Sequence, residues 1–284
     1  MGQKSRRMSQ PLVIFIHGLN TFGDDQFHAG PLVFGPMHQF WKPRLEACGF
    51  EFFALDKMGF GPFEDQVERA VEQIEQLLSR RVLDRAVHLF GHSMGGLVAR
   101  GVAAKLVANP AFSAFARLCS VMTLGTPHKG TAATEDALDL SKQSPRFYQA
   151  LKAFGYDLEK RRDAMRFFTV ERVREFSDRH PPLENVDCVS FIGAVRKDQL
   201  SLPFQMIYSK IHSSKGPDAE LSDGLIAANS QEWARVGGVF ELDHFAELGA
   251  FTQITPRSRS RAKHEFDRLV NHVQQIIEST SRST

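Results

Sequence analysis

The stretch Val87-His88-Leu89-Phe90-Gly91-His92-Ser93-Met94-Gly95-Gly96-Leu97-Val98 decides the fold of this 284-residue chain. Its apolar first part predicts a buried strand, its glycines predict a sharp turn, and the residues that follow predict a helix. The turn fits the pattern G-x-S-x-G, in which a serine stands at the tip of a strained strand-to-helix turn with its hydroxyl exposed. Side chains at positions 91 and 95 would collide with the neighbouring strand and helix, so both positions favour glycine. The helix also directs free N–H groups and the positive end of its dipole at Ser93.

A glycine-rich turn that performs no chemistry is the alternative explanation, because the chain holds 21 glycines and the pattern also arises by chance. The context favours a functional turn, since an apolar strand is expected at 86–90 and helical spacing continues through Leu106 and Val107. A serine hydroxyl alone is a poor nucleophile, so other segments must supply a base and an acid.

Length and composition limit the classes of protein to which this chain can belong. Its 284 residues allow one large α/β domain with an inserted cap or two small domains, and 42% hydrophobic residues suffice for a core. The net charge of +2 and the absence of a long basic run argue against a nucleic-acid partner. Three cysteines do not suggest a disulfide framework, and Cys119 and Cys188 fall in expected core strands.

Apolar runs alternate with helical periodicity along the chain, which predicts an α/β fold with a mostly parallel central sheet flanked by helices. We expect strands at 12–16, 52–55, 86–90, 118–124, 188–194 and 239–242, and helices at 63–81, 96–109 and 261–278. About residues 132–183 show helical spacing without a strand, which indicates a helical cap inserted into a single domain of residues 11–284. Most apolar cap residues, Phe167 and Phe168 among them, are expected to pack on the sheet rather than to cover a site. Residues 1–10 are expected to form a disordered leader.

The N-terminal part of the chain gives no targeting signal. No apolar run in the sequence approaches the length that spans a membrane. The run at 12–16, behind the basic N-terminus, is too short for the core of a signal peptide. We therefore expect a cytoplasmic protein, with export by a route that needs no cleaved signal as the open alternative.

A long connection rich in glycine, phenylalanine and histidine occupies residues 20–40. Its length favours a mobile flap over a functional site. His28 and His38 raise the question of a metal, but their spacing matches no zinc pattern and the sequence contains no H-E-x-x-H. We expect no metal site in this connection.

His17 and Gly18 follow the first expected strand, at the edge of the sheet where α/β proteins carry their working loops. A His-Gly step in this place shapes a loop that donates a backbone N–H to an oxyanion, and the residue after the nucleophile donates the second. Leu19 and Met94 are therefore the expected oxyanion-hole donors. We expect the His17 side chain to be structural, bonded to nearby backbone.

His244 is the expected base. It comes immediately after the last expected strand, in the right place to accept the proton of Ser93. Only His264 and His272 lie comparably late in the chain, and both fall inside the C-terminal helix, where a solvated surface role is expected.

Asp223 is the expected acid, because it precedes a glycine in a polar loop and a short buried carboxylate can orient an imidazole and stabilise its charged form. Asp198 is the rival, since it closely follows the strand at 188–194. The side chain of Asp243 is expected to point away from the site because its neighbour, His244, points towards it. The resulting order of serine, aspartate and histidine is that of an α/β-hydrolase.

Three segments resemble the bacterial true lipases of the α/β-hydrolase superfamily. The resemblance covers about residues 12–250, together with the His17-Gly18 step. The segments are Gly91-His92-Ser93-Met94-Gly95-Gly96, which is similar to the family's elbow, Gly125-Thr126-Pro127-His128-Lys129-Gly130-Thr131, which resembles G-[ST]-P-H-x-G-[ST], and Ser222-Asp223-Gly224-Leu225-Ile226, which resembles N-D-G-[LV]-[VI].

The resemblance implies that Ser93 is the nucleophile, Asp223 the acid and His244 the base. The family often holds a calcium ion near this histidine, bound by an aspartate two residues after it. In this chain that position is Ala246, and Glu247 stands one residue further, so we expect no cofactor and doubt calcium. The cap carries no resemblance from which a substrate can be transferred.

These observations predict a carboxylic ester hydrolase that acts on small-molecule or lipid esters through an acyl-enzyme, with transient contact between the cap and a lipid surface. A phospholipase or acyltransferase on the same triad is one alternative. A catalytically idle hydrolase fold used for binding is the other. The oligomeric state and the acyl chain length are not predicted.

Overall fold

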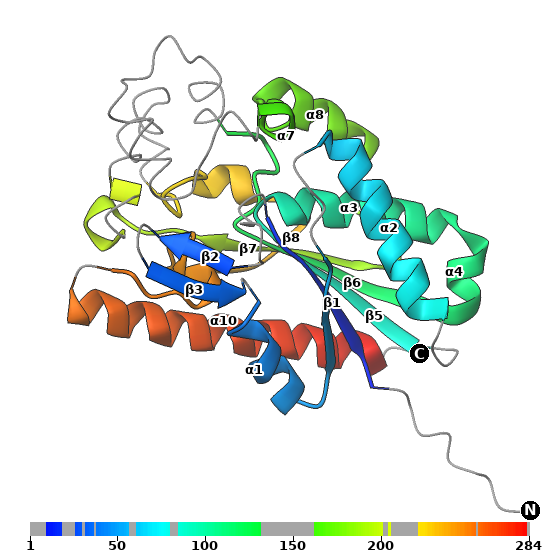
Figure 1. Cartoon of the computed structure of the whole chain (residues 1–284), viewed down its shortest axis with the longest axis horizontal. Helices are drawn as coiled ribbons and strands as arrows, with labels where there is room; N and C mark the ends of the chain where they lie inside the picture. Colours follow the sequence, from blue (N-terminus) through cyan, green and yellow to red (C-terminus); the bar gives the residue numbers. More distant parts are fainter. Residues whose placement is uncertain are drawn as a thin grey trace, which may run out of the picture.

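A six-stranded sheet forms the centre of the molecule (Figure 1). The computed structural model describes residues 10–18, 26–29, 32–36, 38–56, 61–79, 85–131, 162–200, 204–205, 221–253 and 255–282. The strand order is β4-β1-β5-β6-β7-β8, and every neighbouring pair is parallel. The strands are β1 (Leu12–Ile16), β4 (Glu51–Ala54), β5 (Arg85–His92), β6 (Ala116–Leu124), β7 (Asp187–Gly193) and β8 (Arg235–Phe240). The predicted α/β class and parallel sheet are therefore confirmed.

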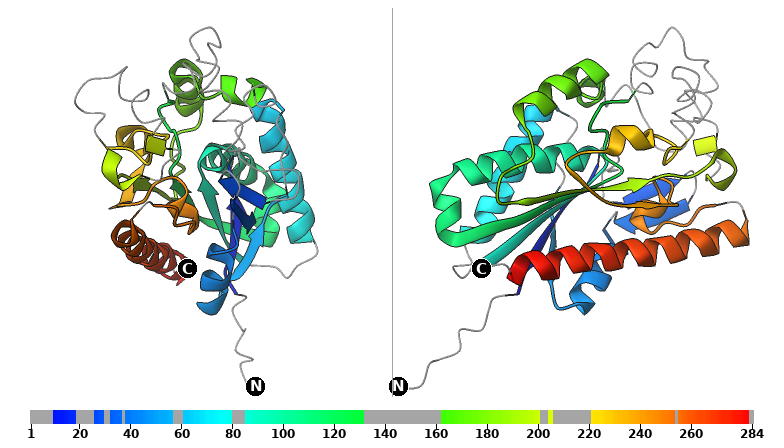
Figure 2. Two further views of the ribbon diagram at one scale, coloured as in Figure 1. Left: turned by 60° about the vertical axis from the view of Figure 1, so that its left-hand side comes forward. Right: turned by 180° about the vertical axis from the view of Figure 1, so that it is seen from behind.

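Helices cover both faces of this sheet (Figure 2). Along β1 the side chains alternate between two cores. Leu12, Ile14 and Ile16 pack with α2 (Phe63–Ser79) and α3 (Met94–Ala108). Val13 and Phe15 pack with α1 (Trp41–Ala47) and α10 (Pro256–Arg282). No described helix is long and apolar enough to cross a membrane. The helices are α1 (Trp41–Ala47), α2 (Phe63–Ser79), α3 (Met94–Ala108), α4 (Pro110–Phe115), α7 (Arg162–Arg166), α8 (Val170–Arg179) and α10 (Pro256–Arg282), with short 3-10 turns η2 (Lys197–Gln199), η4 (Ala228–Gln231) and η5 (Ala246–Leu248).

The connection expected as a flap at 20–40 contains a second sheet. Its strands β2 (Gln26–Ala29) and β3 (Leu32–Pro36) form an antiparallel pair. These strands have four and five residues, and β3 ends in Gly35-Pro36, so no alternation long enough to predict a strand exists in the sequence. Residues 38–40 of the predicted flap form a turn before the next helix, and residues 20–25, 30–31 and 37 lie outside the described residues.

The end of the sheet also differs from the sequence expectation. β8 begins at Arg235, four residues before the expected strand, and α10 begins at Pro256 rather than at 261. Gly237 and Gly238 interrupt the apolar pattern of β8, so the first part of this strand was not predicted from the sequence. Neither difference moves the loop that carries His244.

The described part of the predicted cap is helical, as expected. It comprises α7 and α8, whereas residues 132–161 lie outside the described residues. Phe167 stacks on Phe63 of α2 with ring centroids 3.7 Å apart, and Phe168 is buried in the same core. These two side chains therefore pack against the body of the domain, and Phe167 does so on α2, where the sequence analysis expected packing on the sheet. The domain boundaries stay a prediction, and residues 1–9 also lie outside the described residues.

His88 is expected to make the fold sensitive to acid. It is fully buried in β5, where Nδ1 lies 2.9 Å from Ser120 Oγ and Nε2 lies 3.0 Å from Ser281 Oγ. Burial and, to a smaller extent, the nearby Arg117 lower the pKa of His88 to about 3. The unfolded chain takes up this proton near pH 6.5, so the free energy of unfolding falls by about 1.4 kcal/mol per pH unit between about pH 6.5 and pH 3.

His88→Gln is expected to remove this contribution, because the amide can bond both serines and does not titrate. Urea unfolding at pH 7 and pH 5 measures the effect: the difference in unfolding free energy between the two pH values should shrink by about 2 kcal/mol. His264→Gln, at an exposed position of α10, is the matched control and should leave the difference unchanged. An equal acid sensitivity in His88→Gln and wild type would contradict the assignment.

Candidate active site

Ser93 lies at the tip of the turn between β5 and α3. Its backbone adopts φ 57° and ψ −129°, a strained conformation for a residue with a side chain. A Cβ at position 95 would lie 2.0 Å from the carbonyl oxygen of Ile16 in β1, and one at position 91 would lie 2.4 Å from the carbonyl oxygen of Gly95. The strand and the helix therefore exclude side chains at both glycines, as the sequence predicts. Ser93 itself stays partly exposed.

The loop after β1 passes directly over this turn. A Cβ at Gly18 would lie 2.8 Å from Cβ and 3.2 Å from Oγ of Ser93. The His17 ring is buried, and its Nδ1 lies 3.2 Å from the Gly18 carbonyl oxygen, which agrees with the expected bond to nearby backbone. Met94 is the first residue of α3, where backbone N–H groups have no partner within the helix. Leu19, the other expected oxyanion donor, lies outside the described residues.

Asp223 and His244 form a buried pair, although they are 21 residues apart in the sequence. Oδ2 of Asp223 lies 2.9 Å from Nδ1 of His244, and the backbone N–H of His244 donates to the Asp223 carbonyl at 2.8 Å. The backbone N–H groups of Leu225 and Ile226 donate to Oδ1 at 2.8 and 2.7 Å. Three hydrogen-bond donors thus surround this carboxyl group and fix its orientation towards His244.

The rival and neighbouring carboxylates have other roles. Asp198 is exposed and pairs with Arg196, rather than contacting His244. Asp243 is buried, but its oxygens accept hydrogen bonds from the backbone of η5 and from the side chain of Gln253. Of the two candidates for the acid, Asp223 is the one that contacts His244, and its catalytic role stays a prediction.

Ser93 and His244 lie at the same edge of the sheet. The ring of His92, the residue before Ser93, has its centroid 4.5 Å from that of His244. Ser93 and His244 are both described, and Ser93 Oγ is not hydrogen-bonded to the His244 ring. Contacts of this kind often close only around bound substrate, so this geometry is compatible with a nucleophile and its base.

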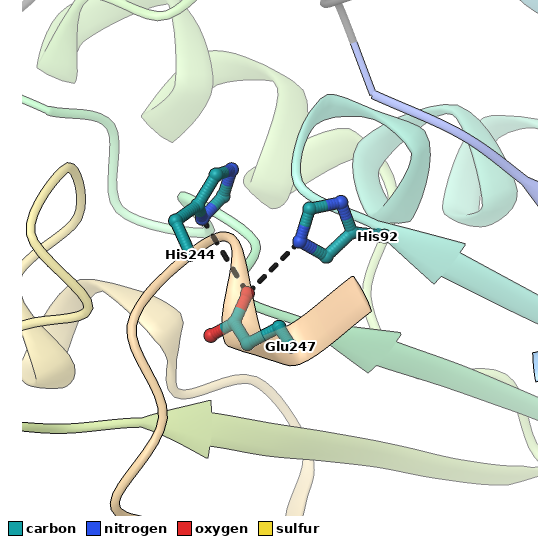
Figure 3. Close-up of side chains that lie close together, drawn as sticks. All are labelled: His92, His244 and Glu247. Atoms are coloured by element: carbon teal, nitrogen blue, oxygen red, sulfur yellow. Dashed lines mark hydrogen bonds and ion pairs between the residues drawn. The ribbon is translucent and has the colours of Figure 1, made fainter. Parts of the chain in front are cut away.

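Glu247 is a site residue that the sequence did not reveal as one. Its fully buried carboxyl places Oε2 2.9 Å from His92 Nε2 and 3.4 Å from His244 Nδ1 (Figure 3). Burial and the nearby Asp223 and Asp243 raise the pKa of Glu247 well above its ordinary value. Glu247 lies three residues after the expected base, and this spacing was a usable signal. The sequence analysis considered Glu247 only as the neighbour of Ala246, the position at which the resembling family has a calcium ligand.

The donor set of this cluster does not fit calcium. His92, His244 and Glu247 hold ligand atoms within 4.8 Å of one another, the one such group among the described residues. Two of the three would offer nitrogen, whereas calcium takes oxygen ligands. Ala246, at the position where the resembling family has an aspartate, offers no side-chain oxygen, and Asp243 uses its oxygens on η5 and Gln253. We therefore derive no step through a calcium ion.

The parallel sheet, the strained serine turn and the Asp223–His244 pair define the class of this protein as an α/β-hydrolase. The family model described as PGAP1-like alpha/beta domain matches residues 50–229, and the chain belongs to this family. The matched region includes Ser93 and Asp223 and ends before His244.

Curated relatives and solved structures agree with this class. The chain is 31% identical over 143 residues to triacylglycerol lipases of Pseudarthrobacter phenanthrenivorans and Burkholderia plantarii; the match covers 47% of this chain and 38% and 34% of those proteins. It therefore spans well under half the length of these relatives. The crystal structure of Staphylococcus hyicus lipase covers 100% of both chains with a TM-score of 0.66 at 15% identity, which shows the fold. The resemblance to α/β-hydrolases of the bacterial lipase type is confirmed.

Proposed function

We propose that this protein is a carboxylic ester hydrolase acting on acyl esters, lipids included, with Ser93 as nucleophile, His244 as base and Asp223 as acid. The observation that carries the proposal is the buried Asp223–His244 pair at the edge of the sheet where the strained turn presents Ser93. The names of the curated relatives, triacylglycerol lipases, support the substrate class.

In the proposed first half-reaction, His244 takes the hydroxyl proton of Ser93 while Oγ attacks the acyl carbonyl carbon. The charged imidazole is stabilised by Asp223, whose Oδ2 accepts from Nδ1 at 2.9 Å. When the carbon–oxygen bond to the alcohol breaks, His244 gives its proton to the leaving oxygen. The acyl group remains bonded to Ser93.

In the second half-reaction, water replaces the alcohol and follows the same route in reverse. His244 takes a proton from water, the hydroxide attacks the acyl carbon, and the acid leaves as Ser93 recovers its proton. In both half-reactions the negative oxygen of the tetrahedral intermediate needs two donors. We assign these to the backbone N–H groups of Met94, at the start of α3, and of Leu19, which follows the glycine that lies against Ser93.

A series of p-nitrophenyl esters from two to sixteen acyl carbons, with triacylglycerol emulsions and phospholipid vesicles, tests the substrate class. We expect kcat/KM to rise from acetate to medium and long chains, because burial of each added methylene group contributes about 0.8 kcal/mol of binding free energy. An optimum at acetate would contradict the lipid part of the proposal. Preference for vesicles would instead indicate the phospholipase alternative, and transfer to an added alcohol over water would indicate an acyltransferase. Binding without turnover of any ester would indicate an idle fold.

A further inference from the structure

The carboxyl group of Glu247 fills a space between the ends of β6 and β7. A Cβ at Gly125, just after β6, would lie 2.1 Å from its Oε2, and a Cβ at Gly193, the last residue of β7, would lie 2.0 Å from its Oε1. Any side chain at either position would displace the carboxyl group. Gly125 also has φ +55°, a conformation that favours glycine. The two glycines therefore make room for this carboxyl in particular.

Two backbone hydrogen bonds also hold Glu247 in place. Its N–H donates to the Asp243 carbonyl at 3.0 Å, and its own carbonyl accepts from Trp41 Nε1 at 3.0 Å. Trp41 is fully buried in the core between the sheet, α1 and α10. The position of the carboxyl is thus fixed by the core and does not depend on a flexible surface turn.

One oxygen of Glu247 faces two imidazole rings. Oε2 lies 2.9 Å from His92 Nε2 and 3.4 Å from His244 Nδ1, and Figure 3 shows both rings converging on it. Among the described residues, neither His92 Nδ1 nor Glu247 Oε1 has a hydrogen-bond partner. The bond between Oε2 and Nε2 is therefore the side-chain contact that holds the His92 ring, which also lies against the backbone of His244.

The groups that face Glu247 favour its uncharged acid form. The carboxylates of Asp223 and Asp243 approach it from the loops around His244, and it is fully buried, so its pKa is raised. Burial lowers the pKa of His92, and His244 and then His17 lower it further. A neutral acid beside a neutral imidazole assigns the proton to Oε2, which donates it to His92 Nε2.

We infer that Glu247 is a positioning residue, which ties the His92 ring, next to the nucleophile, to His244 and so fixes where the base stands relative to Ser93. A single hydrogen bond to Asp223 leaves the His244 ring free to swing about that bond. The second contact at Nδ1 and the His92 ring, 4.5 Å away, limit this motion. As an uncharged group Glu247 also adds no further carboxylate charge beside Nδ1 of His244. The inference rests on the proposed function.

Two variants test the inference. Glu247→Leu keeps much of the volume but breaks the tie to His92, and we expect kcat for a p-nitrophenyl ester to fall about 10- to 100-fold with KM within about twofold, because a displaced base acts only on the chemical step. Glu247→Gln can donate an amide proton to His92 Nε2, and it should restore most of the lost kcat. Active-site titration corrects for misfolded protein. Glu241→Gln, on the same loop but paired with Arg261, is the control and should match wild type.

The acid limb of the kcat/KM profile tests whether Glu247 is uncharged. The loss of kcat at unchanged KM and its rescue by Glu247→Gln are the readouts that a purely structural role would not give. Replacing a neutral acid by a neutral amide should leave this limb, which reports the free base, at the same pH. If Glu247 were ionised, Glu247→Gln would remove a negative charge 3.4 Å from Nδ1 and move the limb to lower pH by about one unit or more. Wild-type kcat in Glu247→Leu, or a shifted limb in Glu247→Gln, would overturn the inference. An inactive wild type would instead overturn the proposed function.

Discussion

Replacing Ser93 by alanine is expected to lower kcat for ester hydrolysis by about 10⁶-fold, the size of loss that removal of a serine nucleophile causes elsewhere. The reason is that no other group can form the acyl-enzyme once Oγ is gone. Initial rates on a p-nitrophenyl ester measure the effect, with circular dichroism and thermal unfolding as controls for folding. Ser93 Oγ makes no hydrogen bond to any described residue, so the variant should keep its melting temperature.

Retention of activity within about tenfold of wild type in a folded Ser93→Ala protein would contradict the mechanism. It would show that the strained turn is a structural feature of the fold. If the variant also has a lower melting temperature, its rate is divided by the concentration of folded protein before comparison with wild type. Only the loss per folded molecule reports on the chemical step.

Replacing Asp223 by asparagine is expected to lower kcat by about 10³- to 10⁴-fold, as for a triad aspartate in general. The amide can still occupy the site, but it holds His244 in the wrong tautomer and does not stabilise the imidazolium. Steady-state kinetics with the same ester measure the loss. The matched control is Asp198→Asn, the rival carboxylate on the sequence, whose side chain is 71% exposed. It should retain full activity.

Two results would contradict this assignment of the acid. A loss below about tenfold in Asp223→Asn would mean that His244 does not depend on this carboxylate. A large loss in Asp198→Asn would mean that Asp198 is the acid, although the structure places it at the surface in an ion pair with Arg196.

The sequence predicted the elements that bury a continuous apolar run. β1 agrees residue for residue with the expected strand at 12–16. β5 begins one residue before the expected strand and ends two residues after it, whereas β6 begins two residues early and ends as expected. These runs are buried on both faces, so their pattern needs no alternation to be recognised. The serine turn was predictable for a related reason, since contacts below 2.5 Å exclude side chains at Gly91 and Gly95 and leave a visible sequence pattern.

The features that the sequence did not predict depend on contacts between distant segments. His92 and Glu247 are 155 residues apart, and they meet because η5 packs against the ends of β6 and β7 beside β5. The room for Glu247 comes from Gly125 and Gly193, whose role cannot be separated in the sequence from that of glycines in ordinary turns. The short hairpin of β2 and β3 was missed because its strands are too short to establish a period.

The measurement that tests the central claim most directly is labelling of the folded wild-type protein with a serine-directed fluorophosphonate probe, followed by peptide mass mapping, with and without detergent. The account predicts one adduct, on Ser93, because Ser93 is the serine that a base and an oxyanion hole activate. Labelling that appears only with detergent would still fall on Ser93 and would indicate that access to the site is covered. An adduct on another serine, or none under either condition, would contradict the account.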